Sequence, residues 1–289
     1  MRMLILIDFS WLYNKYYYVA KYSLTQDKGE LNKETLKEIL LRMLKQFFNL
    51  VNKSYPLSRI VLALDSPTSS LKNYQLFEGY KQNRNKEEKR EVYRYLESIV
   101  AELIKCLNSK VFYFIRQKLY ESDQLLAYIV KKYNKDCNII LFSGDKDFLQ
   151  LTAYDNVFIS EKFEKGKFII KTDEEIFQKF KNTKGEDFRR ISSNKRDILK
   201  YRVLKGDISD NLSPVFPRIK DKEVIDIIQN YWIDEGELTE ERIKDILDDL
   251  KHDNLALAEK LKYNKDTWLR NYKIMDLFHV EDIKFKRLK

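Results

Sequence analysis

Residues 138–147 read Asn-Ile-Ile-Leu-Phe-Ser-Gly-Asp-Lys-Asp, an apolar run that ends in a turn with two acids. A short, nearly continuous apolar run is typical of a strand that is buried on both faces of a parallel sheet. Similar runs occupy residues 3–8, 60–65 and 111–115, and the segments between them carry apolar residues at helical spacing. This alternation predicts an α/β fold with a mainly parallel central sheet and flanking helices. The predicted helices are residues 33–52, 86–108 and 122–135.

A second pair of strands is predicted at Val157–Glu161 and Lys167–Lys171, because a turn-like segment with a glycine, residues 163–166, separates them. From about residue 172 onward the apolar spacing is helical. We therefore expect an α/β core over residues 1–172 and a helical C-terminal region over residues 173–289. The helices predicted in that region are residues 173–181, 194–205, 221–231 and 239–261.

The composition is that of a folded, basic protein. A chain of 289 residues can bury a sizeable core, and 44% hydrophobic with 34% charged residues indicates a well-solvated globule. The formal net charge is +9. A basic surface suits a polyanion that is bound through its phosphates, but an excess of cations can also serve solubility alone.

The cysteines, histidines and N-terminus exclude several classes of protein. Cys106 and Cys137 lack metal-ligand spacing, which argues against a zinc–thiolate site and a disulfide framework. His252 and His279 lie far along the chain from the acidic segments, so imidazole chemistry is not expected. The N-terminus has no signal-peptide pattern, and no apolar run approaches the ~20 residues that span a bilayer. We expect a cytoplasmic monomer that does not bind membranes.

Acidic residues follow several of the predicted strands. Asp8, Asp65 and Asp145 lie at or just beyond the ends of apolar runs, and Glu121 and Asp123 open the helix after another run. Because the carboxyl ends of parallel strands meet at one edge of a sheet, these carboxylates should lie close together. Crowded carboxylates need a partner, since desolvation and mutual repulsion otherwise protonate them. Two Mg²⁺ ions, for which Mn²⁺ can substitute, fit best and suit an in-line phosphoryl displacement.

Each acidic segment also has a simpler interpretation. Asp145 or Asp147 can cap the helix that follows, and Glu121 or Asp123 can complement a helix dipole. Residues 206–211, Gly-Asp-Ile-Ser-Asp-Asn, can be a helix stop followed by a turn. The joint order of the segments favours the metal site.

In this order the segments resemble the flap endonuclease or 5′-3′ exonuclease family, over about residues 4–232. Within the family the chain is most similar to the phage branch, which includes the ribonuclease H-like 5′-nuclease of T-even phages. The resemblance implies a PIN-like nuclease core with a helical arch at about residues 68–96. The matching motifs are Ile7-Asp8, Leu64-Asp65, Gly79-Tyr80-Lys81-Gln82-Asn83-Arg84, Glu121-Ser122-Asp123, Ser143-Gly144-Asp145-Lys146-Asp147 and Gly206-Asp207-Ile208-Ser209-Asp210-Asn211.

The resemblance also implies catalytic roles. Lys81 and Arg84 would neutralise the scissile phosphate, although Lys81 can also be a surface lysine that follows the strand backbone. Gln124 stands where the family usually has a further acid, so altered binding of a second metal is a hypothesis. The first metal would be held by Asp8, Asp65, Glu121, Asp123 and Asp145, and the second by Asp147, Asp207 and Asp210.

Two basic segments and a loop are predicted to bind nucleic acid. Residues 72–94 mix cations with aromatic side chains, which suits a single strand, and they correspond to the arch of the family; the alternative is an amphipathic helix with a charged outer face. Residues 181–205 are strongly basic and would bind duplex phosphates. The loop after Asn211 has two prolines and no glycine, so the ion-binding hairpin of the family is not expected. The basic tail over residues 284–289 is expected to be frayed. The predicted contacts are Lys72, Tyr80, Lys81, Arg84, Lys86, Lys89, Arg90, Lys195, Arg196, Lys200, Arg202, Arg218, Lys220 and Lys222.

These features predict a metal-dependent, structure-specific 5′-nuclease, acting as 5′-3′ exonuclease and flap endonuclease on DNA and RNA primers in replication or repair. Its partners would be DNA with 5′ ends or flaps and RNA–DNA hybrids, with a single-strand-binding protein or a sliding clamp as protein partners. No Gly-x-x-x-x-Gly-Lys-Ser/Thr loop is present, so nucleotide hydrolysis is not implied. One alternative is a non-catalytic nucleic-acid-binding protein. A second alternative is a PIN-type ribonuclease, and the arch and residues 206–211 disfavour this one.

Overall fold

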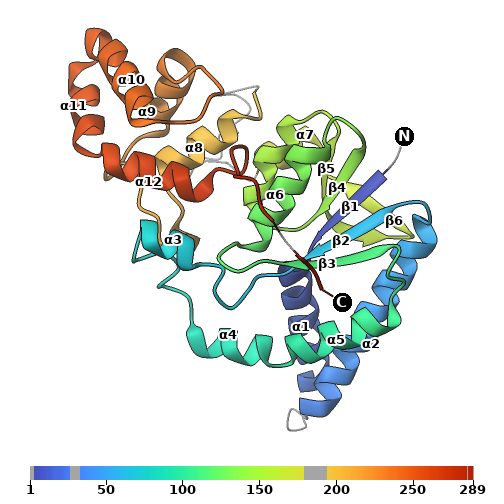
Figure 1. Cartoon of the computed structure of the whole chain (residues 1–289). Helices are drawn as coiled ribbons and strands as arrows, with labels where there is room; N and C mark the ends of the chain where they lie inside the picture. The colour runs from blue at the N-terminus through green and yellow to red at the C-terminus, as the bar shows by residue number, and fades with distance from the viewer. Residues whose placement is uncertain (1–2, 27–32, 179–193, 285, 289) are drawn as a thin grey trace.

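The computed structural model describes residues 3–26, 33–178, 194–284 and 286–288. Its described strands form one sheet in the order β6-β5-β4-β1-β2-β3-β7 (Figure 1). The strands from β1 to β5 run parallel, while β6 and β7 pair antiparallel at the two edges. The predicted mainly parallel sheet is therefore confirmed. The strands are β1 (Met3–Asp8), β2 (Arg59–Ala63), β3 (Phe112–Arg116), β4 (Asn138–Phe142), β5 (Val157–Glu164), β6 (Lys167–Ile170) and β7 (Lys286–Arg287).

β1 lies at the centre of the sheet, between β2 and β4. Ile5, Leu6 and Ile7 are fully buried, because helices cover both faces of this strand. The register pairs Asp8 with Ala63, the last residue of β2. The acid at the end of β1 therefore lies at the carboxyl edge of the sheet.

Helices pack on both faces of the sheet (Figure 1). On the face of Ile5 and Ile7, three helices complete one hydrophobic cluster. On the other face, Leu6 belongs to a second cluster that includes residues of the C-terminal helices. The helices are α1 (Phe9–Gln26), α2 (Lys33–Ser54) and α5 (Leu96–Cys106) on the first face and α6 (Ser122–Tyr133) on the second.

α1 is absent from the predicted elements. Leu12, Tyr13 and Tyr17 are almost fully buried, at the spacing of one helix face. The helix begins directly after Asp8, and the Trp11 N–H in its first turn donates to Asp8 Oδ1 over 3.1 Å. α1 therefore fixes the orientation of the acid at the end of β1.

The helix predicted over residues 86–108 is divided in the structure. α4 (Lys86–Val92) is followed by a 3₁₀ turn at Tyr93–Tyr95 before α5 begins. α3 (Leu71–Leu76) and α4 connect the neighbourhood of α12 (Lys265–Met275) with that of α1 (Figure 1). Hydrogen bonds between tyrosine hydroxyls of α1 and glutamates of residues 86–92 hold this segment in place.

The C-terminal region is helical, as predicted. Trp232 and Trp268 are almost fully buried, with ring centroids 5.4 Å apart. The helix predicted over residues 239–261 is interrupted at Asn254, whose side chain caps a second helix, and α12 was not predicted. None of the helices in the described part of the chain is long and apolar enough to cross a membrane. The helices are α7 (Asp173–Gln178), α8 (Asp197–Lys205), α9 (Asp221–Asp226), α10 (Glu240–Asp253), α11 (Leu255–Tyr263) and α12 (Lys265–Met275).

The end of the chain pairs with the sheet, so the predicted frayed tail is wrong. β7 is antiparallel to β3, and the Leu288 N–H donates to the Phe114 carbonyl over 2.9 Å. Leu288 also packs against the hydrophobic cluster that covers the first face. The strand covers backbone groups of β3 that would otherwise be an open sheet edge.

Candidate metal and nucleic-acid site

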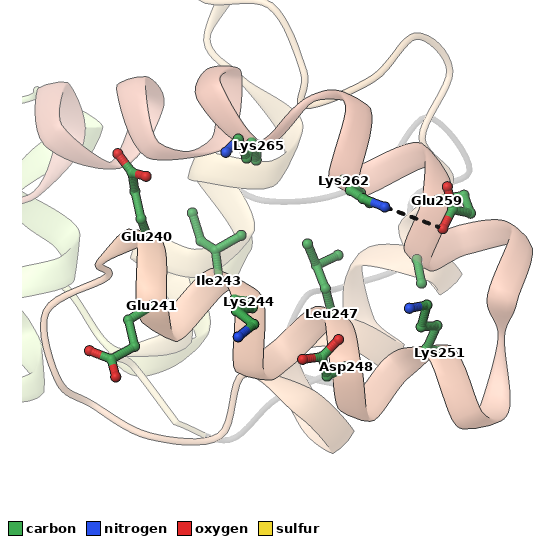
Figure 2. A pocket seen from close by; sticks show the side chains of 11 residues that line it. Glu240, Glu241, Ile243, Lys244, Leu247, Asp248, Lys251, Glu259, Lys262 and Lys265 are labelled. Carbon is green, nitrogen blue, oxygen red and sulfur yellow. Dashed lines mark ion pairs between the residues drawn. The ribbon is translucent and has the colours of Figure 1, made fainter.

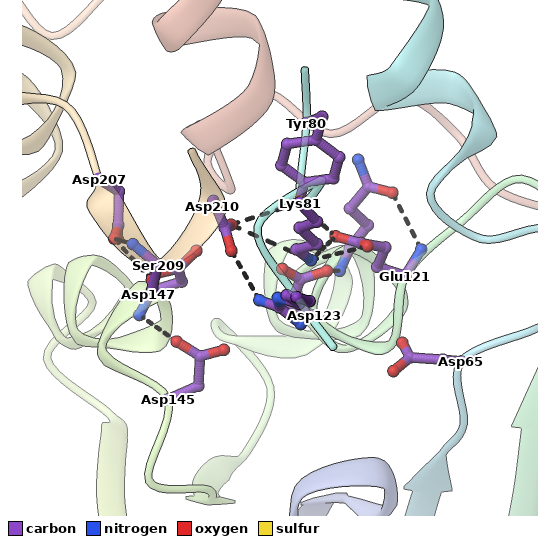
Figure 3. A network of polar contacts seen from close by, with 12 residues as sticks. Asp65, Tyr80, Lys81, Glu121, Asp123, Asp145, Asp147, Asp207, Ser209 and Asp210 are labelled. Atoms are coloured by element: carbon purple, nitrogen blue, oxygen red, sulfur yellow. Dashed lines mark hydrogen bonds and ion pairs between the residues drawn. The ribbon is translucent and has the colours of Figure 1, made fainter. Parts of the chain in front are cut away.

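Acids that follow the strands lie at the carboxyl edge of the sheet, where Figure 3 shows Asp65, Asp123 and Asp145. Asp8 is the last residue of β1, and Asp65 and Asp145 follow the neighbouring strands β2 and β4. Glu121 and Asp123 stand at the start of α6, the helix after β3. Consecutive neighbours in the sheet thus each contribute an acid to one place.

Hydrogen bonds with serine residues orient Asp8 and Asp65. Asp8 Oδ2 accepts from Ser143 Oγ over 3.0 Å, and Asp8 Oδ1 accepts from Ser122 Oγ over 3.2 Å. The Ser122 N–H donates to Asp65 Oδ1 over 2.8 Å, and the Asp65 N–H donates to Ser10 Oγ over 3.0 Å. Burial, followed by the charge of Asp65, raises the pKa of Asp8 to about 6.

The turn after β4 fixes Asp145. Its N–H donates to Ser143 Oγ over 3.1 Å, and its Oδ1 accepts from the Asp147 N–H over 3.0 Å. Asp145 therefore caps the 3₁₀ helix Lys146–Ala153, which confirms the simpler interpretation of this residue. Desolvation by the protein atoms around the carboxylate, followed by the charge of Asp147, raises the pKa of Asp145 to about 8, although part of this residue is exposed. Capping through one oxygen is compatible with a second role.

Basic side chains of the arch pair with two of the acids. Lys81 Nζ lies 2.8 Å from both carboxylate oxygens of Glu121 and 4.0 Å from Asp210 Oδ2. Arg84 Nη2 lies 2.6 Å from Asp210 Oδ1, and the Tyr80 hydroxyl donates to Glu121 over 2.8 Å. Burial lowers the pKa of Lys81, but the carboxylates of Glu121 and Asp210 outweigh it, so this pKa lies above its usual range.

A buried arginine holds two further acids together. Arg202 Nη2 lies 2.5 Å from Asp147 Oδ1 and 2.7 Å from Asp207 Oδ2, and Lys146 Nζ lies 3.0 Å from Asp207 Oδ2. Burial raises the pKa of Asp207, but the hydrogen bonds from Ser209 and the charge of Arg202 outweigh it, and the pKa lies well below its usual range. Asp207 thus remains a carboxylate with protein cations as partners.

The acids therefore fall into two groups. One group forms ion pairs with Lys81, Arg84, Lys146 or Arg202. No basic side chain in the described ranges forms an ion pair with the other group. The paired acids are Glu121, Asp147, Asp207 and Asp210, and the acids without such a partner are Asp8, Asp65, Asp123 and Asp145.

The acids without a basic partner fit a hard divalent ion. Burial, followed by the charge of Glu121, raises the pKa of Asp123 well above its usual range. A nearby cation would oppose such shifts, and carboxylate oxygens are the ligands that Mg²⁺ prefers. Within the described residues, no three acidic, histidine or cysteine side chains form a ready-made ligand set. The arrangement suits an ion that keeps several waters and takes few direct carboxylates.

Gln124 makes a structural contact at the start of α6. Its Oε1 accepts from the Glu121 N–H over 3.1 Å, which is one half of a capping box. The residue that departs from the family pattern therefore fixes the backbone of Glu121. Its effect on a second metal stays a hypothesis.

Three predicted nucleic-acid contacts are buried, which corrects their prediction as surface residues. Tyr80 and Lys200 are each 5% exposed and Arg202 is 4% exposed. The Tyr80 hydroxyl belongs to the acidic network, and Lys200 Nζ donates to the Trp232 carbonyl over 2.7 Å. These side chains support the structure from inside and cannot follow a phosphate backbone.

The remaining predicted contacts differ in exposure. Lys195 and Arg196 are half-buried and form ion pairs, at 2.7 Å with Asp173 and at 3.0 Å with Glu235. The side chains of Lys86 and Lys89, and the basic part of residues 179–193, lie outside the described residues. Lys72 and Lys81 are half-buried, and the exposed contacts are Arg84, Arg90, Arg218, Lys220 and Lys222.

The glycine-free loop after Asn211 still adopts a left-handed backbone. Arg218 has a φ of 62°, a region that usually favours glycine. Val215, Phe216 and Ile219 of the loop are buried in the second hydrophobic cluster. The loop is therefore held by apolar packing and presents Arg218 to solvent.

A cavity of about 550 Å³ lies between α10 and α11, away from the acids (Figure 2). Ile243, Leu247 and Ala258 form its apolar part, and both lysines and acidic residues surround them. None of the strand-end acids lines it. This cavity is not part of the candidate site.

Sequence reasoning missed the residues that orient the acids. Ser122 and Ser143 bind Asp8, and a Cβ on Gly144 would lie 2.7 Å from the Trp11 ring, so that ring contacts the backbone of the acidic turn. The serines stand beside acids in the motifs, which is a usable signal. The sequence around Arg202 carries no such signal, because which face of α8 is buried depends on tertiary packing.

The amino-acid sequence has relatives of known family. Residues 3–181 match the family described as 5′-3′ exonuclease, N-terminal resolvase-like domain. The chain is 24% identical over 235 residues to the 5′-3′ exonuclease of Buchnera aphidicola subsp. Schizaphis graminum, which is 79% of this chain and 70% of that protein. It is 24% identical over 277 residues to the 5′-3′ exonuclease of Mycoplasmopsis pulmonis, which is 94% of this chain and 80% of that protein.

The fold also matches a solved phage structure. A bacteriophage T5 flap endonuclease, crystallised as a pseudo-enzyme–product complex with DNA and metal ions, has a TM-score of 0.59 and 19% sequence identity. The match covers 96% of this chain and 90% of that chain. At this identity the likeness concerns the fold, and it confirms the fold that the phage-type resemblance implied.

Proposed function

Because the chain belongs to the 5′-3′ exonuclease family, we propose that it is a Mg²⁺-dependent 5′-nuclease that cuts phosphodiesters near the junction of a 5′ end or flap with duplex. The substrates would be DNA and the RNA primers of RNA–DNA hybrids. One observation carries the proposal. Acids that follow neighbouring strands share this edge of the sheet with Lys81, which pairs with Glu121 (Figure 3), and Arg84 pairs with Asp210; both cations can neutralise a phosphate.

Carboxylates at the sheet edge would hold the metal. A divalent ion bound there would lower the pKa of a coordinated water and stabilise charge on phosphate oxygens. Ser122 and Ser143 keep the oxygens of Asp8 in fixed directions, so this acid needs little rearrangement to act as a ligand. We assign Asp8, Asp65, Glu121, Asp123 and Asp145 to the first metal and Asp147, Asp207 and Asp210 to the second, with Mn²⁺ as a possible substitute for Mg²⁺.

Lys81 and Arg84 would contact the reacting phosphate. Both cations already lie against carboxylates, and a phosphate is an equally suitable acceptor for them. When they turn to a phosphate oxygen, charge that develops there is stabilised in a partly buried site. The charges of Glu121 and Asp210 are then released from these ion pairs.

Exposed cations outside the acids would hold the substrate. Arg90 lies on α4 of the arch. Arg218 and Lys220 lie in the loop before α9, and Lys222 lies in the first turn of α9. Contacts of this kind to phosphates are independent of sequence and weaken with salt. The T5 enzyme of the same fold was crystallised with DNA, which supports DNA as the substrate class.

A second candidate is a structure-specific nucleic-acid-binding protein without catalysis. The observation that favours it is that Glu121, Asp147, Asp207 and Asp210 are already neutralised by protein cations. A protein of this kind would bind a flapped duplex tightly and leave it intact in the presence of metal.

The test is cleavage of a 5′-flapped duplex labelled in turn at each end, with Mg²⁺ or with EDTA. The variant is Asp145→Asn, and Asp155→Asn is the matched control, because Asp155 is an exposed acid before β5, at the opposite edge of the sheet. Metal-dependent cleavage near the junction that only Asp145→Asn loses supports the nuclease. Tight binding without cleavage by the natural chain supports the second candidate.

A further inference from the structure

Two turns that are far apart in the sequence exchange hydrogen bonds beside the acids. They are the arch turn, residues 79–84, and the acidic turn, residues 207–211. Asn83 Nδ2 donates to the Ile208 carbonyl over 2.7 Å, and Asn211 Nδ2 donates to the Gly79 carbonyl over 2.7 Å. Each turn thus gives one asparagine side chain to the backbone of the other.

A backbone hydrogen bond lies between these two contacts. The Lys81 N–H donates to the Asp210 carbonyl over 3.1 Å. Lys81 has a φ of 54° and Asn211 a φ of 61°. Both values lie in the left-handed region, which residues other than glycine rarely adopt. Such conformations persist where the surroundings impose them, and they are frequent at functional sites. Contacts between the turns therefore accompany an unusual backbone in both.

The turns are also joined by ion pairs of Arg84 and Lys81 with the carboxylate of Asp210. Arg84 pairs with Asp210, and Lys81 lies 4.0 Å from the same carboxylate. A substrate phosphate would compete for these cations, which weakens the ion pairs that join the turns. The asparagine side chains carry no charge, so a phosphate is attracted to them less strongly than to Lys81 and Arg84.

We propose that Asn83 and Asn211 are positioning residues that keep the arch turn and the acidic turn in register while Lys81 and Arg84 exchange carboxylates for phosphate. This inference rests on the proposed function. It assigns the asparagines no contact with substrate. Their role is to hold the backbone from which Lys81 and Asp210 reach the reacting group.

The test uses Asn83→Ala, Asn211→Gly and their double variant. Glycine tolerates the positive φ at position 211, so Asn211→Gly removes the side chain without adding backbone strain. Asn264→Ala is the control, because Asn264 is a half-buried asparagine whose side chain likewise donates one hydrogen bond to a backbone carbonyl, that of Lys260, over 2.8 Å. The measurements are hydrogen exchange of the Lys81 amide without DNA, and kcat and KM on a flapped duplex.

We expect each single variant to speed exchange of the Lys81 amide by about fivefold, the equivalent of one hydrogen bond. The value of kcat should fall by a similar factor, while KM for DNA stays within about twofold. Unchanged exchange, faster exchange with unchanged kcat, or an equal loss in Asn264→Ala overturns the proposal. If the natural chain does not cut DNA, the proposed function fails, and exchange alone then decides whether the asparagines hold the turns.

Discussion

Arg202 and Asp207 form a buried ion pair, with 2.7 Å between Arg202 Nη2 and Asp207 Oδ2. The two residues are 4% and 5% exposed. The pair joins the last turns of α8 to the acidic turn that follows Gly206. A residue that resembles a duplex contact in the sequence is therefore an internal counter-ion for the acids of the site.

Replacement of Arg202 by methionine should destabilise the protein strongly. Removal of Arg202 leaves Asp147 without its ion pair and Asp207 with Lys146 alone, and breaking a buried pair in this way typically costs about 3–5 kcal/mol. Urea unfolding of Arg202→Met measures this loss. Lys205→Met on the same helix is the control, because its ion pair with Asp221 is more exposed and should contribute about 1 kcal/mol or less. Equal losses in the two variants would contradict the role of Arg202.

Gly206 should not tolerate a side chain. Its φ is 71°, and a Cβ would lie 2.4 Å from the Leu212 carbonyl oxygen. Gly206→Ala should therefore cost about 1–3 kcal/mol or more in unfolding free energy. At Gly236 a Cβ would lie no nearer than 3.3 Å, from Asp234 Oδ1, so Gly236→Ala should change stability by less than about 0.5 kcal/mol. A Gly206→Ala protein as stable as Gly236→Ala would refute the close approach.

Asp8 should make the metal-free protein less stable as pH rises. Its pKa is 3.8 in the unfolded chain and about 6 in the fold, so the native state binds more protons between these values. Stability from this group is present below about pH 4 and is lost as pH rises through about 6. The loss is at most about 3 kcal/mol.

Urea unfolding in EDTA at pH 5 and pH 8 measures this dependence. Asp8→Asn keeps the shape of the side chain without the charge, so it should reduce the difference in stability between the two pH values. Added Mg²⁺ should stabilise the natural chain more at pH 8 than at pH 5, because metal and protons compete for the carboxylate. The same pH dependence in Asp8→Asn and the natural chain would show that Asp8 is not the group responsible.

Gln124→Glu tests the effect of the acid that the chain lacks. Glutamate can keep the capping contact with the Glu121 N–H and adds a negative charge at the same place. We expect half-maximal cleavage at a lower Mg²⁺ concentration than in the natural chain. Mg²⁺ titrations of flap cleavage measure the midpoint, and superimposable curves would remove Gln124 as a cause of altered metal binding.

The sheet and its acidic edge could be predicted because both depend on short local patterns. An apolar run such as residues 138–142 specifies a buried strand, and the acid after it needs only the parallel topology to reach the site. α1 could also have been predicted, since Leu12, Tyr13 and Tyr17 have helical spacing. The run of tyrosines conceals an apolar face that is clear once the rings are seen to be buried.

The partners of the acids could not be predicted in the same way. Arg202 and Lys200 lie on one short helix among many cations, and nothing local distinguishes a buried cation from one that faces solvent. Which helix face is covered depends on the C-terminal helices, whose packing is set by contacts far apart in the sequence. The docked tail has the same cause, because β7 pairs with β3 through backbone groups.

The most direct test of the account is the single-turnover rate at which the chain cuts a 5′-flapped duplex at saturating Mg²⁺, measured for the natural protein, Asp123→Asn and Asp155→Asn. Asp123 is an acid of the site without a basic partner, so its neutral variant should be slower by about 100-fold or more, while Asp155→Asn keeps the natural rate. Cleavage by Asp123→Asn at the natural rate, or no cleavage by the natural chain despite tight binding, would contradict a metal-dependent nuclease site at this edge of the sheet.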